Sequence, residues 1–259
     1  VGKVSGKKFY LNTLNSQLKI ENCYGDDKTT AEIALIKTVN QFLESAVLKS
    51  AFNLEPSLSD LKEKSTIIDR DTKAPEILNC VKKVFGEDVD SYLQLYVAPT
   101  LINPKLHNQF SVSLKINEEE IKKITEIRDF IEQGKKLEDF EGYKKFEISK
   151  NPETPEALQK FFPEAPANPL IEKVLKNLRP GETWPDIIED DNGFRIVRLL
   201  SEDENKYYCD GVFIPKKQFD PWFQDYVKNN IKIEIKDEQL LSQIRQDYPT
   251  LWWLEAVEA

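Results

Sequence analysis

The feature that most constrains the fold is an Asn-Gly dipeptide between two apolar stretches. Asn192-Gly193 follows residues 184–188 and opens residues 193–200, and both stretches carry mostly apolar side chains. Asn-Gly is the strongest short hairpin signal, because both central residues of the tight turn adopt positive φ. Residues 207–214 form another apolar strand-like stretch. The second half of the chain is therefore predicted to contain an antiparallel sheet.

The first half of the chain shows helical periodicity after a short predicted hairpin over residues 1–14. Thr29 and Glu32 have the spacing of a capping box, in which a hydroxyl and a carboxylate satisfy free backbone amides. Apolar residues then recur at helical spacing, which predicts a helix that ends near Asn53. A second helix is expected after Pro56, and its cap is expected to be Ser57 or Ser59.

Two prolines suggest where a first domain boundary lies. Residues 74–96 are predicted to be helical with a break at Gly86, and Pro99 and Pro104 follow. Because proline interrupts helices, we expect the chain to cross into another domain there, at about residue 105. Phe110–Ile116 then alternates apolar and polar side chains, as a half-buried strand does.

The remaining elements complete an α+β fold. Residues 118–133 are predicted to form a helix ended by Gly134, and residues 150–169 contain five prolines and are expected to form a loop. Asp220-Pro221 is typical of a helix start. A strand over residues 231–235 and a helix over residues 237–247 are expected to follow. The predicted architecture is a mostly helical lobe built from residues 1–105 and 203–259, with residues 106–202 inserted as a sheet domain.

Composition excludes several classes of function. The 259 residues include 36 basic and 45 acidic side chains, so the net charge is −9, which disfavours a general nucleic-acid binder. No apolar run approaches the roughly 20 residues that span a bilayer. The chain contains no Met, so Val1 is not a natural start, and we expect that a segment such as a signal peptide was removed. Three widely spaced Cys favour three small buried side chains over a disulfide plus a free thiol.

The order of these elements resembles that of a parvulin (rotamase) domain within a foldase. Val112–Ile116 is similar to the first parvulin strand, and Leu178-Arg179-Pro180-Gly181-Glu182 is similar to the leucine-x-x-glycine-glutamate turn of that family. Gly193-Phe194-Arg195-Ile196 resembles the last hairpin of the family. The flanking regions, from Val4-Ser5-Gly6 to the Pro221-Trp222-Phe223 helix, resemble SurA-, PrsA- and PpiD-type chaperones.

This resemblance implies an extracytoplasmic folding factor of the periplasm or cell envelope that binds unfolded or secreted polypeptides. It implies no cofactor and no nucleic-acid partner. Such a factor holds clients by transient burial of apolar segments in a cradle of helices. The alternative implied by the resemblance is an active or weakly active peptidyl-prolyl isomerase, and a more distant one is a subunit that only scaffolds envelope partners.

The catalytic positions of the resemblance depart from the family pattern. Active parvulins carry one histidine in the first strand and one in the last, where this chain has Ser113 and Arg195. Arginine is always charged and only donates hydrogen bonds, so it cannot share a proton as imidazole does. We therefore expect a non-catalytic domain. The candidate peptide-binding residues are aromatic, and core packing is the alternative role for them: Phe161, Phe162, Trp184 and Phe194.

Other candidate sites have simpler explanations. His107 is the only histidine, which nearly excludes a catalytic triad or a histidine zinc site, and it is expected to lie in a surface loop. Glu118-Glu119-Glu120 is expected to form the first turn of a helix, where carboxylates favour the positive end of the dipole. Trp252-Trp253 could grip a client or pack back onto the helical lobe.

Overall fold

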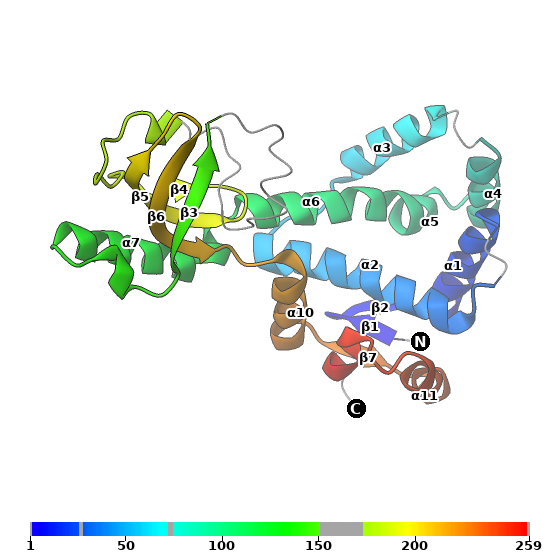
Figure 1. Cartoon of the computed structure of the whole chain (residues 1–259). Helices are drawn as coiled ribbons and strands as arrows, with labels where there is room; N and C mark the ends of the chain where they lie inside the picture. Colours follow the sequence, from blue (N-terminus) through cyan, green and yellow to red (C-terminus); the bar gives the residue numbers. More distant parts are fainter. Residues whose placement is uncertain (1, 26–27, 72–74, 151–172, 258–259) are drawn as a thin grey trace. The chain divides into compact units, whose positions relative to one another are not determined.

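The chain divides into two compact units (Figure 1). The computed structural model describes residues 2–25, 28–71, 75–150 and 173–257. Unit 1 comprises residues 1–112 and 218–259, and unit 2 comprises residues 113–217. The chain passes from one unit to the other between residues 112 and 113 and again between residues 217 and 218. Both boundaries come later than the predicted ones, which lay between residues 105 and 106 and between residues 202 and 203. The first crossing moves because one helix continues through Pro104, and the second because residues 206–215 pair within the sheet of unit 2.

Unit 1 is built around a long central helix, α2 (Ala31–Phe52). The side chain of Thr30 caps α2 by accepting a hydrogen bond from the N–H of Ile33, and Asn53 ends the helix with a φ of 55°. The helix ends where the sequence predicts, but the cap is Thr30 alone and not the expected capping box with Glu32. The other helices of this unit are α1 (Leu11–Cys23), α3 (Leu58–Arg70), α4 (Pro75–Phe85), α5 (Val89–Tyr92), α6 (Ala98–Val112), α10 (Phe219–Asn230) and α11 (Glu238–Asp247).

A small sheet joins the two ends of the chain within unit 1. The predicted N-terminal hairpin consists of β1 (Gly2–Val4) and β2 (Lys7–Phe9), and β7 (Ile233–Ile235) pairs antiparallel with β1. The C-terminal 3-10 helix η4 (Trp252–Ala256) buries Trp253 completely in the same core. Of the two roles left open for this tryptophan pair, Trp253 therefore packs back onto the helical unit.

A disulfide fastens α1 to α4. Cys23 and Cys80 are bonded, with their Cα atoms 5.6 Å apart, and Cys209 is a free, buried thiol in unit 2. The expectation that all three cysteines are reduced core residues is therefore wrong for two of them. Widely spaced cysteines carry no pairing information in a single sequence, since contact between α1 and α4 arises only in the folded unit.

Unit 2 contains a four-stranded antiparallel sheet in the order β3-β6-β5-β4. Its strands are β3 (Tyr143–Ser149), β4 (Ile188–Glu189), β5 (Gly193–Glu202) and β6 (Lys206–Pro215). Helix α7 (Glu118–Glu132) packs on one face through Ile124 and Ile127. The other face carries a separate apolar cluster that includes Val174, Leu175, Val197, Leu199 and Cys209.

Two local predictions for unit 2 need correction. Phe110–Ile116 is not a strand, because α6 continues to Val112 and a 3-10 helix, η2, spans Leu114–Asn117. The hairpin at Asn192-Gly193 does form, but neither residue has positive φ. Instead the carboxylate of Asp190 accepts hydrogen bonds from the backbone N–H groups of Asn192 and Gly193, at 2.8 and 3.0 Å. The turn is therefore closed by a side chain and not by the expected pair of left-handed residues.

The α+β prediction is confirmed at the level of class, since the described residues form helices and two small antiparallel sheets. Glu118-Glu119-Glu120 does form the first turn of α7, and Gly134, with a φ of 94°, follows the end of that helix. His107 lies within α6 and stacks on Phe219, with ring centroids 3.7 Å apart, so it is not a loop residue. Within the described residues, none of the helices is long and apolar enough to cross a membrane.

Candidate functional site

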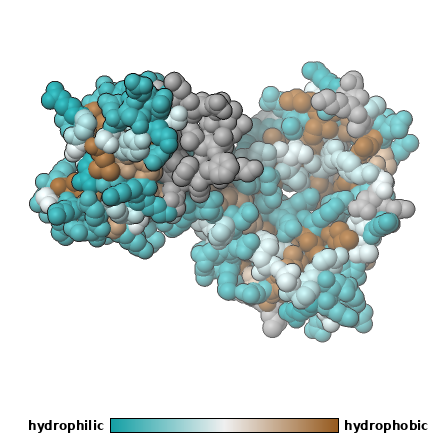
Figure 2. Space-filling view, in the orientation of Figure 1, coloured by the Kyte–Doolittle hydropathy of each residue, from teal (hydrophilic) through white to brown (hydrophobic). Residues whose placement is uncertain are grey.

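The best candidate for a binding site is a groove in unit 1, which we call the helical groove. It has a volume of about 420 Å³ and lies between the N-terminal hairpin, α2, the link from α2 to α3, and α6. Figure 2 shows hydrophobic residues gathered on the visible face of this unit among hydrophilic ones. The groove is lined mainly by apolar side chains, with a few polar ones: Lys7, Phe42, Ser45, Glu55, Pro56, Leu61, Gln94, Leu95, Ala98 and Ile102.

The floor of the helical groove contains an irregular helical segment. Between α5 and α6 the chain forms a short π-helix, η1 (Leu93–Val97), and Gln94 and Leu95 of η1 line the groove. A π-helical turn adds a residue to the helix and redirects its side chains, and such turns occur frequently at functional sites. Here the π-helix leaves Leu95 half-buried and Gln94 exposed at the groove, while Leu93 and Val97 stay in the core.

One wall of the helical groove is aromatic with a cation beside it. Phe42 of α2 packs edge-on against Phe9 of β2, with ring centroids 5.6 Å apart. The ammonium of Lys7 lies 5.1 Å from the centre of the Phe42 ring. The groove is therefore lined by an aromatic ring with a positive charge over its face, an arrangement that accepts apolar side chains next to a polar backbone.

The opposite wall is α3, which is held to the rest of unit 1 near both of its ends. Near its C-terminal end, Asp69 accepts a hydrogen bond from the hydroxyl of Tyr92 at 3.2 Å and pairs with Lys82 at 3.0 Å. Leu61 anchors it in the core, and Lys105 of α6 donates a hydrogen bond to Asp60 at 2.9 Å. Asp60 also completes a capping box with Ser57, one of the two predicted caps. The hydrogen bonds from Lys105 and Ser57 lower the pKa of Asp60 to about 2. Leu58 and Ile67, each 55% exposed, leave apolar surface on this helix.

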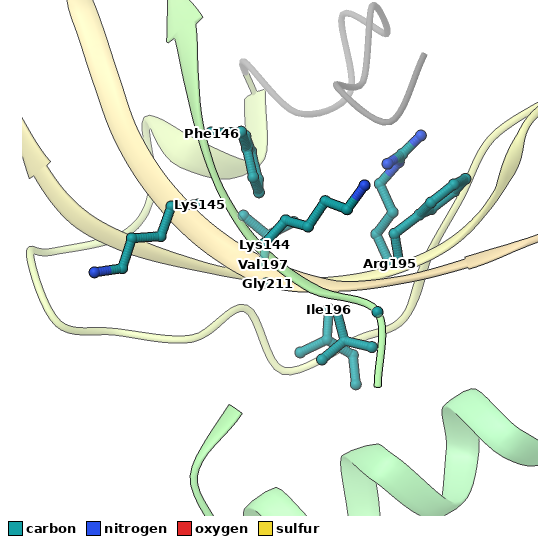
Figure 3. Close-up of a pocket in the computed structure, with 10 residues that line it drawn as sticks. Lys144, Lys145, Phe146, Arg195, Ile196, Val197 and Gly211 are labelled. Carbon is teal, nitrogen blue, oxygen red and sulfur yellow. The ribbon is translucent and has the colours of Figure 1, made fainter. Parts of the chain in front are cut away.

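A second, smaller hollow lies on the sheet of unit 2 and has a volume of about 60 Å³ (Figure 3). Its floor is the backbone of Gly211, where an added Cβ would come within 2.1 Å of the carbonyl oxygen of Ile196. Figure 3 shows Lys144, Phe146 and Arg195 projecting from one face of the sheet, while Ile196 points to the other. This sheet pocket therefore combines a backbone floor with three cationic side chains in its lining, those of Lys144, Lys145 and Arg195.

The sheet pocket contains one of the two positions that the sequence analysis singled out as departures from the parvulin pattern. The guanidinium of Arg195 is buried, donates from Nε to Asp190 Oδ2 at 2.8 Å, and lies 4.0 Å from the centre of the Phe213 ring. Ser113 lies outside the sheet, directly before the 3-10 helix η2. The two positions therefore do not lie on adjoining strands, as the predicted strand over residues 110–116 would have required.

The predicted peptide-binding aromatics do not line one pocket. Trp184 is partly buried on the face that carries Val197 and Leu199, and its backbone N–H donates to the backbone carbonyl of Val197 at 2.9 Å. Phe194 is 3% exposed and packs on the opposite face, with α7. Consecutive residues of a strand alternate between faces, which explains why Phe194 and Arg195 separate. Phe161 and Phe162 lie outside the described residues.

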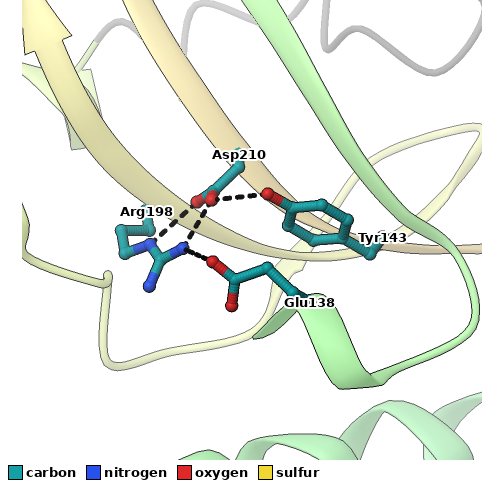
Figure 4. A network of polar contacts seen from close by, with 4 residues as sticks. All are labelled: Glu138, Tyr143, Arg198 and Asp210. Carbon is teal, nitrogen blue, oxygen red and sulfur yellow. Dashed lines mark hydrogen bonds and ion pairs between the residues drawn. The ribbon is translucent and has the colours of Figure 1, made fainter. Parts of the chain in front are cut away.

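A buried ionic network fixes the α7-facing side of the sheet (Figure 4). Arg198 donates to both carboxylate oxygens of Asp210 and to Glu138, and the hydroxyl of Tyr143 donates to Asp210 at 3.0 Å. Asp210 is 1% exposed. The carboxylates raise the pKa of Arg198 above its already high value, and burial followed by the bond to Asp210 raises the pKa of the Tyr143 hydroxyl. Every group in the network is paired, so its role is to hold β3, β5 and β6 in register.

Sequence reasoning predicted a cradle of helices but named none of the residues of the helical groove, because its lining comes from distant segments. Phe42, Leu61 and Ile102 all belong to apolar helical stripes that a sequence predicts simply as core. Nothing in the sequence marks residues 93–97 as a π-helix. Searches for a matching family model, a similar curated protein and a similar solved structure found no match for this chain.

Proposed function

We propose that this chain is a protein-folding factor that binds unfolded polypeptide segments in the helical groove. The observation that carries the proposal is the apolar groove itself, with its π-helical floor between Phe42 and α3. Its volume lies within the range of pockets that enclose side chains of a ligand. Binding of this kind needs no catalytic group, since a holding factor acts by preferential binding to the unfolded state.

The apolar surface around the helical groove supports the same proposal. Leu58 and Ile67 on α3 are each more than half exposed. Exposed apolar side chains that cluster beside a groove mark interaction sites for other proteins. A client segment that lies in the groove would extend over these side chains.

Prolyl isomerisation is not supported by the arrangement in unit 2. Arg195 is held by Asp190 and Phe213, and Ser113 is outside the sheet, so the described residues do not bring these two positions together across adjoining strands. We propose that this unit is a binding or spacing element and not an isomerase.

An extracytoplasmic location is part of the proposal. Disulfides persist in oxidising compartments such as the periplasm and are rare in the cytosol. The bond between Cys23 and Cys80 lies within the unit that carries the helical groove, so the proposed client-binding unit is suited to such a compartment.

The proposal is tested by light scattering of a chemically unfolded client that aggregates on dilution. Wild-type protein is expected to suppress the aggregation in proportion to its concentration. Leu95→Glu places a charge in the groove, where burial without a partner is costly, and is expected to remove most of the protection. Val89→Glu is the matched control, because it makes the same kind of change on α5 at a side chain that is 59% exposed and does not line the groove.

Two results would contradict the proposal. One is a wild-type protein that leaves aggregation unchanged at a several-fold molar excess over the client. The other is equal protection by the Leu95→Glu and Val89→Glu variants, which would show that the protection comes from elsewhere on the protein. Circular dichroism of each variant checks that unit 1 remains folded.

A further inference from the structure

The two edges of the sheet in unit 2 differ in length. Strand β3 is the edge strand of the order β3-β6-β5-β4, and among the described residues no strand pairs with its outer side. It is seven residues long, whereas β4 at the opposite edge is only two residues long. A long open edge is a template for pairing with another chain, and a very short one is not. Strand β3 is therefore the edge of this sheet at which a further strand can pair.

The hydrogen bonds at the two ends of β3 show which of its backbone groups point outward. Residues opposite each other in an antiparallel ladder alternate between pairs that exchange hydrogen bonds and pairs that do not. The carbonyl of Gly142 and the N–H of Lys150, directly before and after β3, both bond to the chain on the side of β6. The even-numbered residues of β3 therefore bond to β6, and the N–H and C=O groups of Lys145 and Glu147 face the open side.

The two outward-facing residues carry opposite charges. Lys145 and Glu147 are both exposed and, because they are two residues apart, their side chains lie on the same face of the strand. Glu147 accepts a hydrogen bond on Oε2 from Lys206 at 2.6 Å, a pair in which both side chains are about half exposed. Within the described part of the chain, no carboxylate pairs with the ammonium of Lys145. The edge therefore presents one cation and one anion to an incoming strand.

A second copy of β3 that runs antiparallel to the first matches these charges in one register. Hydrogen bonds form only where outward-facing residues lie opposite each other. When the twofold axis passes through Phe146, Lys145 of each copy lies opposite Glu147 of the other, and all seven residues of both strands pair. An axis through Lys145 or through Glu147 places like charges opposite each other and pairs fewer residues. Opposite charges across a strand pair stabilise it and like charges destabilise it, so charge and strand length select the same register.

The same register brings an aromatic contact to the axis. Phe146 is partly buried and packs against the apolar cluster that includes Val197 and Leu199. In the register centred on Phe146, the two copies of this residue lie directly opposite each other as a pair that exchanges no backbone hydrogen bonds, where side chains come closest. Aromatic pairs across strands stabilise a sheet. Pairing would therefore cover part of each ring that stays exposed in a single chain.

We propose that two copies of this chain form a twofold-symmetric dimer by antiparallel pairing of their β3 strands. The charges of Lys145 and Glu147 and the contact between the two Phe146 rings determine its register. The assembly closes at two copies, because the far edge of each sheet is the two-residue strand β4. One strand pair is a small interface, so the association is expected to be weak and to depend on concentration. This inference goes beyond the proposed client binding and does not depend on it.

Sedimentation velocity over a series of protein concentrations measures the association. Wild-type protein is expected to form a dimer that dissociates on dilution, and that dissociates more readily at high salt because the charges are exposed. Lys145→Glu and Glu147→Lys each place like charges opposite each other on both sides of the axis, and each is expected to weaken the dimer about tenfold. An equimolar mixture of these two variants is the matched control. In a mixed dimer opposite charges again face each other at both positions, so the mixture is expected to dimerise as the wild type does.

Hydrogen exchange of the wild-type protein locates the contact. The amides of Lys145 and Glu147 are expected to exchange rapidly at low concentration and to become protected at high concentration, while the amides of α2 do not change. An unfolded client added at low concentration is expected to leave these two amides unprotected. Leu95→Glu in the helical groove is expected to leave the dimer unchanged, so failure of the dimer and failure of client binding are distinguishable.

Four results would overturn the inference. The first is a wild-type protein that stays monomeric at its highest soluble concentration, and the second is a dimer that the single variants do not weaken or that their mixture does not restore. The third is protection of the Lys145 and Glu147 amides in the monomer, since the chain itself would then cover the edge. The fourth is protection of these amides by an unfolded client without a dimer, which would assign the edge to other polypeptides. Exchange is measured on the wild-type protein, so the inference stays testable even where a variant does not fold.

Discussion

Removal of the Cys23–Cys80 disulfide is expected to destabilise unit 1 and to leave unit 2 unchanged. The bond joins α1 to α4, and the chain that it encloses contains α2 and α3, two of the elements that line the helical groove. Both sulfurs and all of the enclosed residues belong to unit 1. The double variant Cys23→Ala/Cys80→Ala therefore isolates the contribution of the crosslink to the unit that we propose binds clients.

The size of the effect follows from the length of the enclosed chain. The two cysteines are 57 residues apart, and closing a loop of that length lowers the entropy of the unfolded chain. In the chain-entropy account the loss is about 14 cal/mol/K, which corresponds to about 4 kcal/mol of stability at 25 °C. Because a domain has a total stability of only about 5–15 kcal/mol, a loss of this size leaves unit 1 marginally folded.

Denaturant unfolding measures this effect, with tryptophan fluorescence as the probe of unit 1 and alkylation of Cys209 as the probe of unit 2. Trp184 is the one tryptophan of unit 2, while Trp222, Trp252 and Trp253 report on unit 1, so a Trp184→Phe background makes fluorescence specific to unit 1. The double variant is expected to shift the transition of unit 1 alone. Cys209 serves as an internal control: burial raises the pKa of its thiol to about 12, so it should resist alkylation in the folded protein, whereas Cys23 and Cys80 react after reduction. Equal stability of the double variant and the wild type would refute the reasoning.

Three further predictions concern single contacts. The carboxyl of Asp60 should titrate near pH 2 by NMR, and the Lys105→Met variant should move the pKa of Asp60 up toward its ordinary value. Because the pKa of Asp60 is lowered in the folded state, the stability that this carboxylate contributes is present above about pH 4 and is lost as the pH falls toward 2. An unchanged titration of Asp60 in the variant would contradict this prediction. Arg198→Ala should destabilise unit 2 by about 3–5 kcal/mol in denaturant unfolding, because it leaves the buried charge of Asp210 without its main partner. Glu138→Ala should destabilise unit 2 by no more than about 1 kcal/mol, because this carboxylate is exposed. Similar losses of stability in the two variants would argue against the network. Wild-type protein should leave the cis–trans rate of a short proline peptide at its uncatalysed value, and so should the Ser113→His/Arg195→His double variant, because Ser113 lies outside the sheet; acceleration by the wild type would show that the sheet pocket is catalytic.

The elements that a sequence can predict here are those whose local signals agree with their tertiary setting. The helix that ends at Asn53, the Ser57 cap and the hairpin at Asn192-Gly193 all depend on short-range hydrogen bonds made by nearby side chains. The prediction of a strand over residues 110–116 was wrong, because alternation of apolar and polar side chains over a few residues competes with continuation of the preceding helix. The buried residues Ala98, Ile102 and Leu106 hold α6 together across Pro104, and the helix then extends to Val112.

Elements with weak local signals were missed for a related reason. Helix α1 buries Leu14, Gln17 and Ile20 on one face, and the polar Gln17 interrupts the apolar stripe that would have marked the helix. Strand β3 carries two consecutive lysines and only one fully buried side chain, as an edge strand does. The π-helix of the helical groove depends on packing between distant segments, so no short sequence pattern predicts it.

The position of Arg195 connects the sequence comparison to the proposed chemistry. At the position where the predicted parvulin resemblance would place an imidazole, this chain has a guanidinium, which only donates hydrogen bonds and is fixed by Asp190 and Phe213. A guanidinium that is held by Asp190 cannot take part in proton sharing. This position therefore argues against catalysis by unit 2, which makes the proline-peptide assay on the wild-type protein the most informative experiment on that unit.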